Sequence, residues 1–509
     1  YYECQQDYEQ AIALTQQARW AAEQNLQAKD SLYQWEWQTG RILKAQGEIV
    51  KAIQVYEKAV STLEAIRTDL LITNRDLQFD FRDAVDPVYR DLVELRLNLE
   101  QANALMSPAP KENRIQESKK DNVNAALKTL DSLRLAELQN YFGDDCAVLA
   151  ATTVSENAAE RATAISTGNG QATAIFSSVI LNDRTGLIVT LPDGQQQIAW
   201  IDADRDTLRT LVNQYRLSLE RFFEPFDFQF AQQLYTWMIH PFEETLSQAQ
   251  IKTLVFVQDG ILRSVPMAAL HDGQQFLIQK YAIATTPSLT LTSPAPLKRS
   301  GLRALALGLT NAVQIGEQTF PALNYVNQEI QAIESELPGS RQFLNQDFTR
   351  DRIQQELSRS AYPILHLSTH GQFGIDPENT FLITGDQQKL SLPGLEALIR
   401  SARSGDGIEL LTLTACETAI GDDRAALGLG GVAIQAGAKS ALASLWFVDD
   451  AATTQLSTQF YANLRNPSMS KAEALQAAQV SLIQSGTAEN SEAVHPAFWA
   501  AFILIGNWL

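Results

Sequence analysis

Two stretches in the C-terminal half of this 509-residue chain decide its fold: ILHLSTHG at residues 364–371 and LLTLTACETA at residues 410–419. Each is an apolar, β-prone run that gives way abruptly to small polar residues, which is typical of a buried parallel strand that ends at a site. The first run leads to His370 and the second to Cys416, with room between them for one crossover element. A thiol becomes a strong nucleophile when a nearby imidazole takes its proton. The pattern therefore predicts a cysteine–histidine dyad on two neighbouring strands.

The residues around the dyad leave other interpretations open. Free cysteine is among the most buried residue types, so Cys416 taken alone favours an inert core thiol, and only the THG motif and the ordered flanking motifs favour the nucleophile. His366 lies inside its apolar run, and we expect a hydrogen-bonded core histidine there. Asp376 and Glu378 follow the dyad histidine and could orient it, but the sequence names no third member of the site. A carboxylate aimed at the sulfur would raise the thiol pKa, so we expect Glu417 to point away.

The order of motifs in this half resembles the CHAT domain, a family of caspase-like cysteine peptidases related to separase and commonly joined to TPR repeats. The resemblance covers about residues 240–509, and the region from about residue 130 is also typical of the family. It rests on six motifs: HLSTHG at 366–371, LTACETA at 413–419, ALASLWFVDD at 441–450, DGILRSVPMAAL at 259–270, the Pro-Ser pair at 287–288 and HPAFWAAF at 495–502.

The resemblance implies a role for each site residue. His370 would activate the thiol and protonate the leaving amine, and Cys416 would form the thioester. The backbone N–H groups of Gly371 and Cys416 would form the oxyanion hole, where a residue without a side chain lets a carbonyl approach closely. The surroundings of the cysteine depart from the Gln-Ala-Cys signature of caspases, and nothing matches their basic pocket. Cleavage after aspartate is therefore not expected.

Two acidic residues near the end of the ALASLWFVDD motif bear on substrate choice. This motif resembles the region that lines the primary specificity pocket in separase-like relatives. A carboxylate there would favour Arg or Lys before the scissile bond, and Asp450 is the first candidate, with Asp449 in reserve. Either could instead cap the helix expected near Ala451, a common task for aspartate.

The chain divides by pattern into four parts. Residues 1–105 read as TPR-like helices, 106–122 as a polar linker, 123–247 as a helix plus a β-meander region, and 248–509 as the catalytic α/β domain. In the first part Gly40, Gly47, Ala52, Tyr56 and Ala59 have the spacing of a TPR helix pair, although unrelated helical hairpins would give a similar pattern. Such helices offer concave surfaces to partner proteins or peptides.

The last 260 residues alternate between strands and helices, which predicts a mostly parallel sheet with helices on both faces. Asp-Gly turn chemistry near residue 193 predicts an antiparallel meander before it. We expect strands at 174–181, 185–191, 197–201, 252–257, 303–308, 363–368, 409–414, 440–446 and 500–505, and helices at 204–247, 325–337, 349–359, 423–437, 451–465 and 470–485.

Composition and charge exclude several classes of function. The formal net charge of −19 argues against a nucleic-acid surface, and no apolar run is long enough to span a membrane. Three cysteines far apart favour a reducing compartment, with the cytoplasm as the expected location, although a signal before Tyr1 stays possible. Five histidines lack zinc-ligand spacing, Asp422 and Asp423 are too few for a calcium loop, and the glycine-rich run at 426–431 lacks the ending of a nucleotide loop, so we expect no cofactor.

These observations together predict a cysteine endopeptidase whose helical repeats select a protein substrate or partner. The sequence is also compatible with a latent form that becomes active only when a partner orders its loops. The alternative is a protein-binding scaffold that retains the fold without catalysis. Intact His370, Gly371 and Cys416 favour the enzyme.

Overall fold

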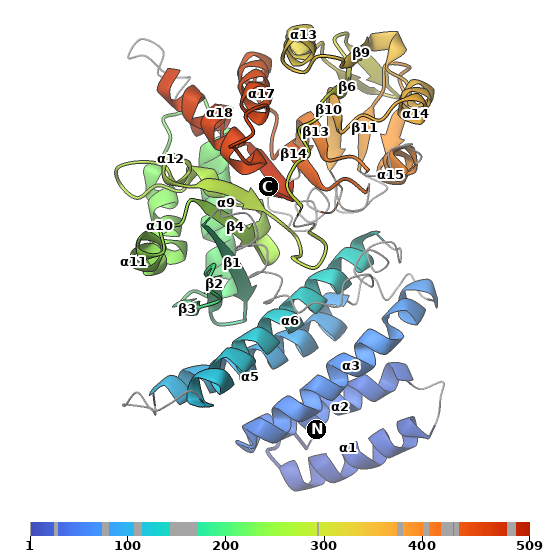
Figure 1. Ribbon diagram of the computed structural model, residues 1–509. Helices are drawn as coiled ribbons and strands as arrows, with labels where there is room; N and C mark the ends of the chain where they lie inside the picture. Colours follow the sequence, from blue (N-terminus) through green and yellow to red (C-terminus); the bar gives the residue numbers. More distant parts are fainter. Residues whose placement is uncertain are drawn as a thin grey trace. The chain divides into compact units, whose positions relative to one another are not determined.

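The chain forms two compact units, Tyr1–Glu160 and Arg161–Leu509. The smaller unit is helical and the larger one is built around a mixed β-sheet (Figure 1). The computed structural model of the protein describes residues 2–24, 29–73, 81–105, 114–142, 172–292, 295–373, 380–400, 407–418, 431, 437–485 and 495–509.

The helices of the smaller unit pack in sequence order, each against the next. Gly47, at φ +79°, ends the second helix, and the N–H of Glu48 closes the turn on the carbonyl of Leu43 at 2.9 Å. A helix–turn–helix layout follows from this turn. The helices are α1 (Tyr8–Glu23), α2 (Lys29–Ala45), α3 (Ile49–Thr73), α5 (Asp86–Leu105), which follows the π-helical turn Phe81–Val85, and α6 (Arg114–Phe142).

Four of the five residues that suggested a TPR pair lie in the core of this unit, and the fifth, Gly47, is exposed in the turn. Ala52, Tyr56 and Ala59 are fully buried. A Cβ on Gly40 would lie 2.7 Å from the Tyr56 ring, so α2 and α3 can approach this closely only because residue 40 has no side chain. The sequence predicted a polar linker up to residue 122 and a helix after it. In the structure α6 already begins at Arg114, so the predicted helix start was too late. Its first turns contain Gln, Glu and Lys, which favour helix, and no proline.

A 13-stranded sheet forms the framework of the larger unit, and this confirms the predicted α/β class. The first three strands form the predicted antiparallel meander, and β1 then pairs in parallel with β4. A separate hairpin consists of β7 (Val313–Ile315) and β8 (Gln318–Phe320). The strands of the large sheet are β1 (Thr173–Ile180), β2 (Thr185–Thr190), β3 (Gln196–Ile201), β4 (Thr253–Val257), β5 (Ala282–Thr285), β6 (Ala304–Gly308), β9 (Arg341–Leu344), β10 (Ile364–Phe373), β11 (Phe381–Ile383), β12 (Lys389–Ser391), β13 (Leu410–Thr418), β14 (Ser440–Ser444) and β15 (Phe502–Gly506).

The two strands singled out in the sequence are central. β10 pairs in parallel with β13 and with β6, and β13 pairs in parallel with β14. Figure 1 shows helices on both sides of this part of the sheet, with α13 and α17 on one side and α14 and α15 on the other. Helices of this unit are α9 (Arg205–Glu220), α10 (Phe228–Met238), α11 (Glu243–Gln248), α12 (Leu277–Lys280), α13 (Val326–Glu336), α14 (Arg350–Arg359), α15 (Leu392–Arg400), α17 (Asp450–Leu464) and α18 (Lys471–Ser485).

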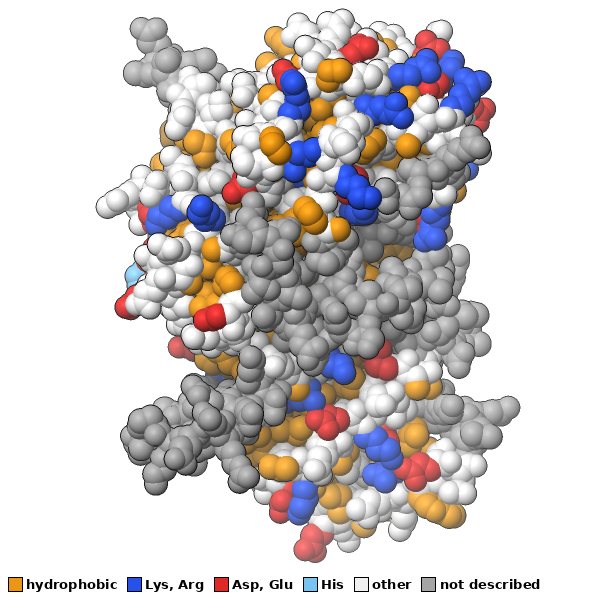
Figure 2. Space-filling view, in the orientation of Figure 1, with side chains coloured by type: hydrophobic (Ala, Val, Ile, Leu, Met, Phe, Trp, Pro, Cys, Tyr) orange, Lys and Arg blue, Asp and Glu red, His pale blue; other side chains and the backbone are white. Residues whose placement is uncertain are grey.

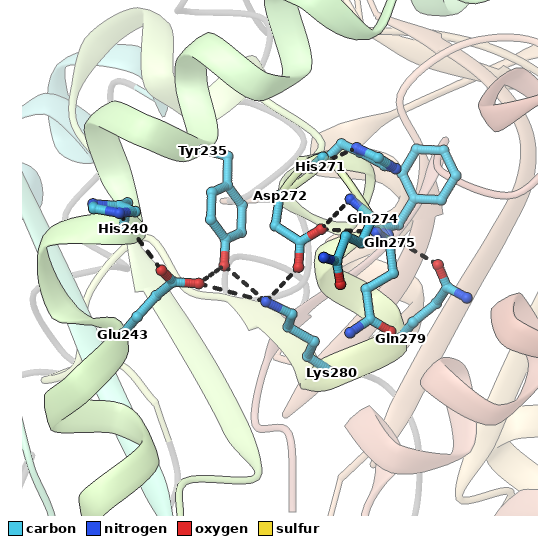
Figure 3. A network of polar contacts seen from close by, with 11 residues as sticks. Tyr235, His240, Glu243, His271, Asp272, Gln274, Gln275, Gln279 and Lys280 are labelled. Atoms are coloured by element: carbon cyan, nitrogen blue, oxygen red, sulfur yellow. Dashed lines mark hydrogen bonds and ion pairs between the residues drawn. The ribbon is translucent and has the colours of Figure 1, made fainter.

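A polar network ties α10, α11 and α12 together (Figure 3). Lys280 lies at its centre, with its Nζ 2.5 Å from Asp272 Oδ2, 3.1 Å from the Tyr235 hydroxyl and 3.5 Å from Glu243 Oε1. The Tyr235 hydroxyl in turn donates to Glu243. Burial alone would raise the pKa of Asp272, but hydrogen bonds from Lys280 and from the N–H groups of Gln275 and Gln274 lower it to about 2. The lysine thus acts as a cross-link among three short elements.

The face drawn in Figure 2 exposes charged, polar and hydrophobic side chains. On the face drawn in Figure 2, acidic and basic side chains are interspersed rather than gathered in separate fields. Among the helices in the described part of the chain, none is both long enough and apolar enough to cross a bilayer.

Candidate active site

The backbone of β10 and β13 brings the two predicted catalytic residues onto neighbouring strands. Ser368 pairs with Thr414, and the next register pair is Gly371 with Cys416, so β10 has one extra residue between these pairs. Such a bulge bends the strand and re-aims the side chains that follow it. The strands run on to Phe373 and Thr418 instead of ending before the histidine and cysteine as the sequence suggested.

His370 is held by a backbone carbonyl. Its Nε2 lies 2.8 Å from the carbonyl oxygen of Pro321, and its ring packs against Phe320 with the centroids 5.3 Å apart. A carbonyl oxygen can only accept a hydrogen bond, so Nε2 must carry a proton. In the neutral ring Nδ1 therefore has the lone pair that can accept a proton from a thiol. The sequence could not reveal this partner, because a backbone carbonyl leaves no residue-type signal.

The structure fixes the backbone of Cys416 in β13, and its side chain lies outside the described part, as does that of Glu417. Gly371, the other residue predicted for the oxyanion hole, also pairs with Leu382 on β11. Asp376, Glu378, Asp422, Asp423 and residues 426–430 of the glycine-rich run lie outside the described residues.

The two aspartates of the ALASLWFVDD motif have different roles. Asp449 caps α17, because its Oδ1 accepts from the N–H groups of Ala451 and Ala452 at 3.0 and 3.3 Å. Asp450 instead accepts from the N–H of Asn324 at 2.9 Å. Burial raises the pKa of Asp450, and the neighbouring Asp449 charge adds to this. Of the two aspartates, Asp449 is therefore the one that caps α17.

One short segment, residues 321–325, links these groups. Its first residue accepts from His370 and its fourth donates to Asp450. The hydroxyl of Thr454, one turn further along α17, lies 3.4 Å from the carbonyl oxygen of Tyr325. The segment therefore joins the histidine to the aspartate considered for the specificity pocket.

A buried arginine contacts Leu445 and Trp446, which precede the two aspartates in the ALASLWFVDD motif. Arg216 on α9 is 1% exposed and donates to the carbonyl oxygen of Leu445 at 3.4 Å, while its guanidinium lies over the Trp446 ring at 5.0 Å. Glu220 Oε1 lies 2.6 Å from Nη2 of Arg216 and neutralises the guanidinium charge. The sequence did not reveal Arg216, because nothing in its helix distinguishes it from a surface arginine.

His366 is a core residue, as expected. It is fully buried, and its Nδ1 lies 3.0 Å from the hydroxyl of Tyr461 on α17. Among the described residues no group of three or more His, Cys, Asp or Glu is arranged to hold a metal ion.

With the fold and site defined, comparison with known proteins identifies the class. The chain belongs to the CHAT domain family, which matches residues 229–507, more than half of its length. The resemblance drawn from the six motifs is thereby confirmed. No curated protein matches the chain.

The fold is similar to that of a chain in a crystal structure of the Saccharomyces cerevisiae separase–securin complex. The TM-score is 0.50 at 9% identity, and the match covers 90% of this chain and 37% of that one. A second crystal structure of the same complex gives 0.46 with the same identity and coverage. The cysteine proteinase gingipain R gives 0.35 at 9% identity, covering 60% of this chain and 74% of that one. The chain thus spans little more than a third of the separase-complex chain.

Proposed function

We propose that this protein is a cysteine endopeptidase in which His370 and Cys416 form the catalytic dyad. The observation that carries the proposal is the backbone position of the two residues on adjacent parallel strands, with His370 in the β10 bulge, Cys416 in the first register pair after it, and the histidine ring held by the Pro321 carbonyl. Membership of a caspase-like peptidase family supports the same reaction class.

The tautomer of His370 gives the order of proton transfers. Because Nε2–H is held by Pro321, Nδ1 takes the proton of the Cys416 thiol, and the thiolate attacks the peptide carbonyl. The resulting imidazolium then donates that proton to the leaving amine. A water molecule, deprotonated by the same nitrogen, hydrolyses the thioester.

The backbone N–H groups of Gly371 and Cys416 are the candidate oxyanion donors in this scheme. They are register partners on β10 and β13, so they lie at the same level of the sheet. A donor of this kind typically contributes about 3–4 kcal/mol to transition-state stabilisation.

Asp450 is the proposed determinant of substrate choice, favouring Arg or Lys before the scissile bond. It is half-buried and accepts hydrogen bonds from the backbone N–H groups of Asn324 and Tyr325. A carboxylate offers about four acceptor positions, so capacity remains for a guanidinium. Asp449 is the weaker candidate, because it already caps α17. Since burial raises the pKa of Asp450, we expect binding of basic substrates to weaken as the pH falls, sooner than it would for an exposed carboxylate.

The helical unit is proposed to select a protein partner or substrate, and a reactive thiol would require a reducing compartment such as the cytoplasm. An enzyme of this kind can stay latent until a partner arrives.

Active-site labelling tests the proposal. Acyloxymethyl-ketone peptides with Arg, Lys, Leu or Asp in the primary position would be incubated with wild type, Cys416→Ala, His370→Ala and Asp450→Asn. Labelling by Arg and Lys probes should vanish in the first two variants and fall at least about tenfold in the third. Retained labelling of Asp450→Asn would discard the acidic pocket. Wild type that no probe labels, with or without candidate partners, would favour the scaffold.

A further inference from the structure

A single buried carboxylate connects the elements that carry the proposed dyad. Glu329 on α13 is 1% exposed. Its Oε2 accepts from Ser368 on β10 at 2.6 Å and faces Thr414 on β13 at 3.5 Å, and its Oε1 accepts from Ser457 on α17 at 2.7 Å. One side chain therefore reaches both dyad strands and the helix that begins at Asp450.

The two strand contacts of Glu329 lie next to the bulge between β10 and β13. Ser368 and Thr414 form the last register pair before the bulge in β10. Beyond the bulge, the next pair is Gly371 with Cys416. The hydroxyl groups of Ser368 and Thr414 both face Oε2 of Glu329. Glu329 therefore contacts β10 and β13 at the same register position, immediately before the bulge.

The third contact extends the network to the other side of the site. Ser457 lies on the same helix as Asp450, which binds the segment that also accepts from His370. That segment runs directly into α13, the helix of Glu329 itself. Through these contacts the Glu329 carboxylate connects α13 and α17 to β10 and β13, the two strands that carry His370 and Cys416.

The electrostatic environment keeps Glu329 ionised. Burial alone would raise its pKa, but the electrostatic interaction with the neighbouring His366 ring and hydrogen bonds from Ser368 and Ser457 lower it below the ordinary value. His366 Nε2 lies 3.4 Å from Oε1, an ion-pair distance rather than a well-formed hydrogen bond. His366 Nδ1 contacts Tyr461, whose hydroxyl lies 2.8 Å from that of Thr412 on β13, so a second chain of contacts joins the same elements.

We propose that Glu329 is a positioning residue for the dyad, which fixes the register of β10 and β13 across the bulge and thereby the relative backbone positions of His370 and Cys416. It touches neither substrate nor reacting atoms. Replacing a buried ionic group by well-packed apolar residues is often neutral or stabilising, so stability alone does not account for a buried carboxylate at this position. A shift of about 1 Å between reacting groups can lower a rate by about 10²-fold. The catalytic part of this inference rests on the proposed function, and the register part does not.

A background with a single thiol provides the test. The chain has three cysteines, so Cys4→Ser with Cys146→Ser leaves only Cys416 to react. In this background the iodoacetamide alkylation rate of Cys416 would be followed from pH 5 to 10, together with hydrogen exchange of the amides at 364–373 and 410–418. Glu329→Gln keeps the shape and removes the charge. Ser368→Ala and Ser457→Ala remove one hydroxyl each and serve if Glu329→Gln does not fold.

A matched control is available in the same unit. Glu356 on α14 is likewise 1% exposed, and it contacts Arg341 at 2.9 Å and the Tyr362 hydroxyl at 3.5 Å, neither of which belongs to β10 or β13. We expect Glu329→Gln to shift the alkylation profile toward that of a simple thiol, near pH 8.5, to lower the rate at pH 6.5 at least about tenfold, and to speed amide exchange around the bulge. Glu356→Gln should match wild type in the alkylation profile, in the rate at pH 6.5 and in amide exchange. This should hold even if Glu329→Gln and Glu356→Gln both lower the melting temperature.

Two results would overturn the inference. A folded Glu329→Gln protein with the wild-type alkylation profile and wild-type amide exchange would show that the carboxylate does not set the register, and so would equal effects of Glu356→Gln. Failure of the proposed function looks different. If His370→Ala leaves the Cys416 profile unchanged, the dyad is wrong, and amide exchange alone then decides whether Glu329 fixes the strand register.

Discussion

Lys471, at the start of α18, is a lysine inside the core of the larger unit. It is fully buried, and among the described residues its Nζ has no hydrogen-bond partner. Burial lowers its pKa from 10.5 to about 7, the nearby charges of Lys439 and Arg299 act in the same direction, and Glu409 opposes them. The unfolded chain therefore binds a proton that the native state rejects between about pH 10.5 and 7, so this residue makes stability fall as the pH decreases through that window.

The prediction is that Lys471→Met raises the free energy of unfolding at pH 7 and flattens its pH dependence up to pH 10. Each pH unit in that window corresponds to at most about 1.4 kcal/mol for one proton. Urea unfolding at pH 7, 8 and 9 would measure it, with Lys252→Met as a control at an exposed lysine. Parallel pH curves for wild type and Lys471→Met would contradict the prediction.

Asp449 gives a second prediction at the residue scale. Its side chain satisfies two N–H groups in the first turn of α17, so Asp449→Ala should destabilise the unit by about 1 kcal/mol, whereas Asp449→Asn should cost much less. Thermal unfolding of the two variants provides the comparison. Equal losses in both would mean that the charge, and not the cap, matters.

Among the elements, the contact between β6 and α13 leaves no spare room. A Cβ on Gly308 would lie 2.5 Å from side-chain carbons of both Val326 and Ile330, and Gly308 pairs with Ser368 on β10. Gly308→Ala should therefore push α13 outward, weaken the Glu329 contacts and lower both the melting temperature and the rate of Cys416 labelling. Gly394→Ala in α15, where the added carbon meets only flexible side-chain atoms at 3.1 and 3.3 Å, should change neither. Wild-type labelling by Gly308→Ala would contradict this role of the helix.

At the scale of the whole molecule, each of the two units has its own hydrophobic core. Gly40→Ala would drive a methyl group into the Tyr56 ring in the helical unit, and Gly308→Ala would disturb only the larger unit. We expect calorimetry to show two transitions, with each variant lowering a different one by several degrees. A single transition that both variants lower together would show that the units unfold as one.

The sequence by itself predicted the class, most element positions and the neighbouring placement of the dyad strands. The antiparallel meander followed from its turn chemistry, and in the structure Gly194 adopts φ +78° and Asp193 accepts from the N–H of Gln195, as an Asp-Gly turn requires. The helix expected at 423–437 lies mostly outside the described residues. These successes share one cause: hydrophobic period, turn residues and caps act over a few neighbouring positions, and the sequence displays them directly.

Only the tertiary structure decided the contacts that position the site. The bulge between Ser368 and Gly371, the Pro321 carbonyl on His370 and the carboxylate of Glu329 join positions that are distant in the sequence or involve backbone atoms. The division of roles between Asp449 and Asp450 also depended on where the 321–325 segment lies. The catalytic roles of His370, Gly371 and Cys416 stay predictions. Residue types and spacing specify which groups a strand delivers, but the packing of α13 and α17 against two strands fixes their register, and no local pattern encodes it.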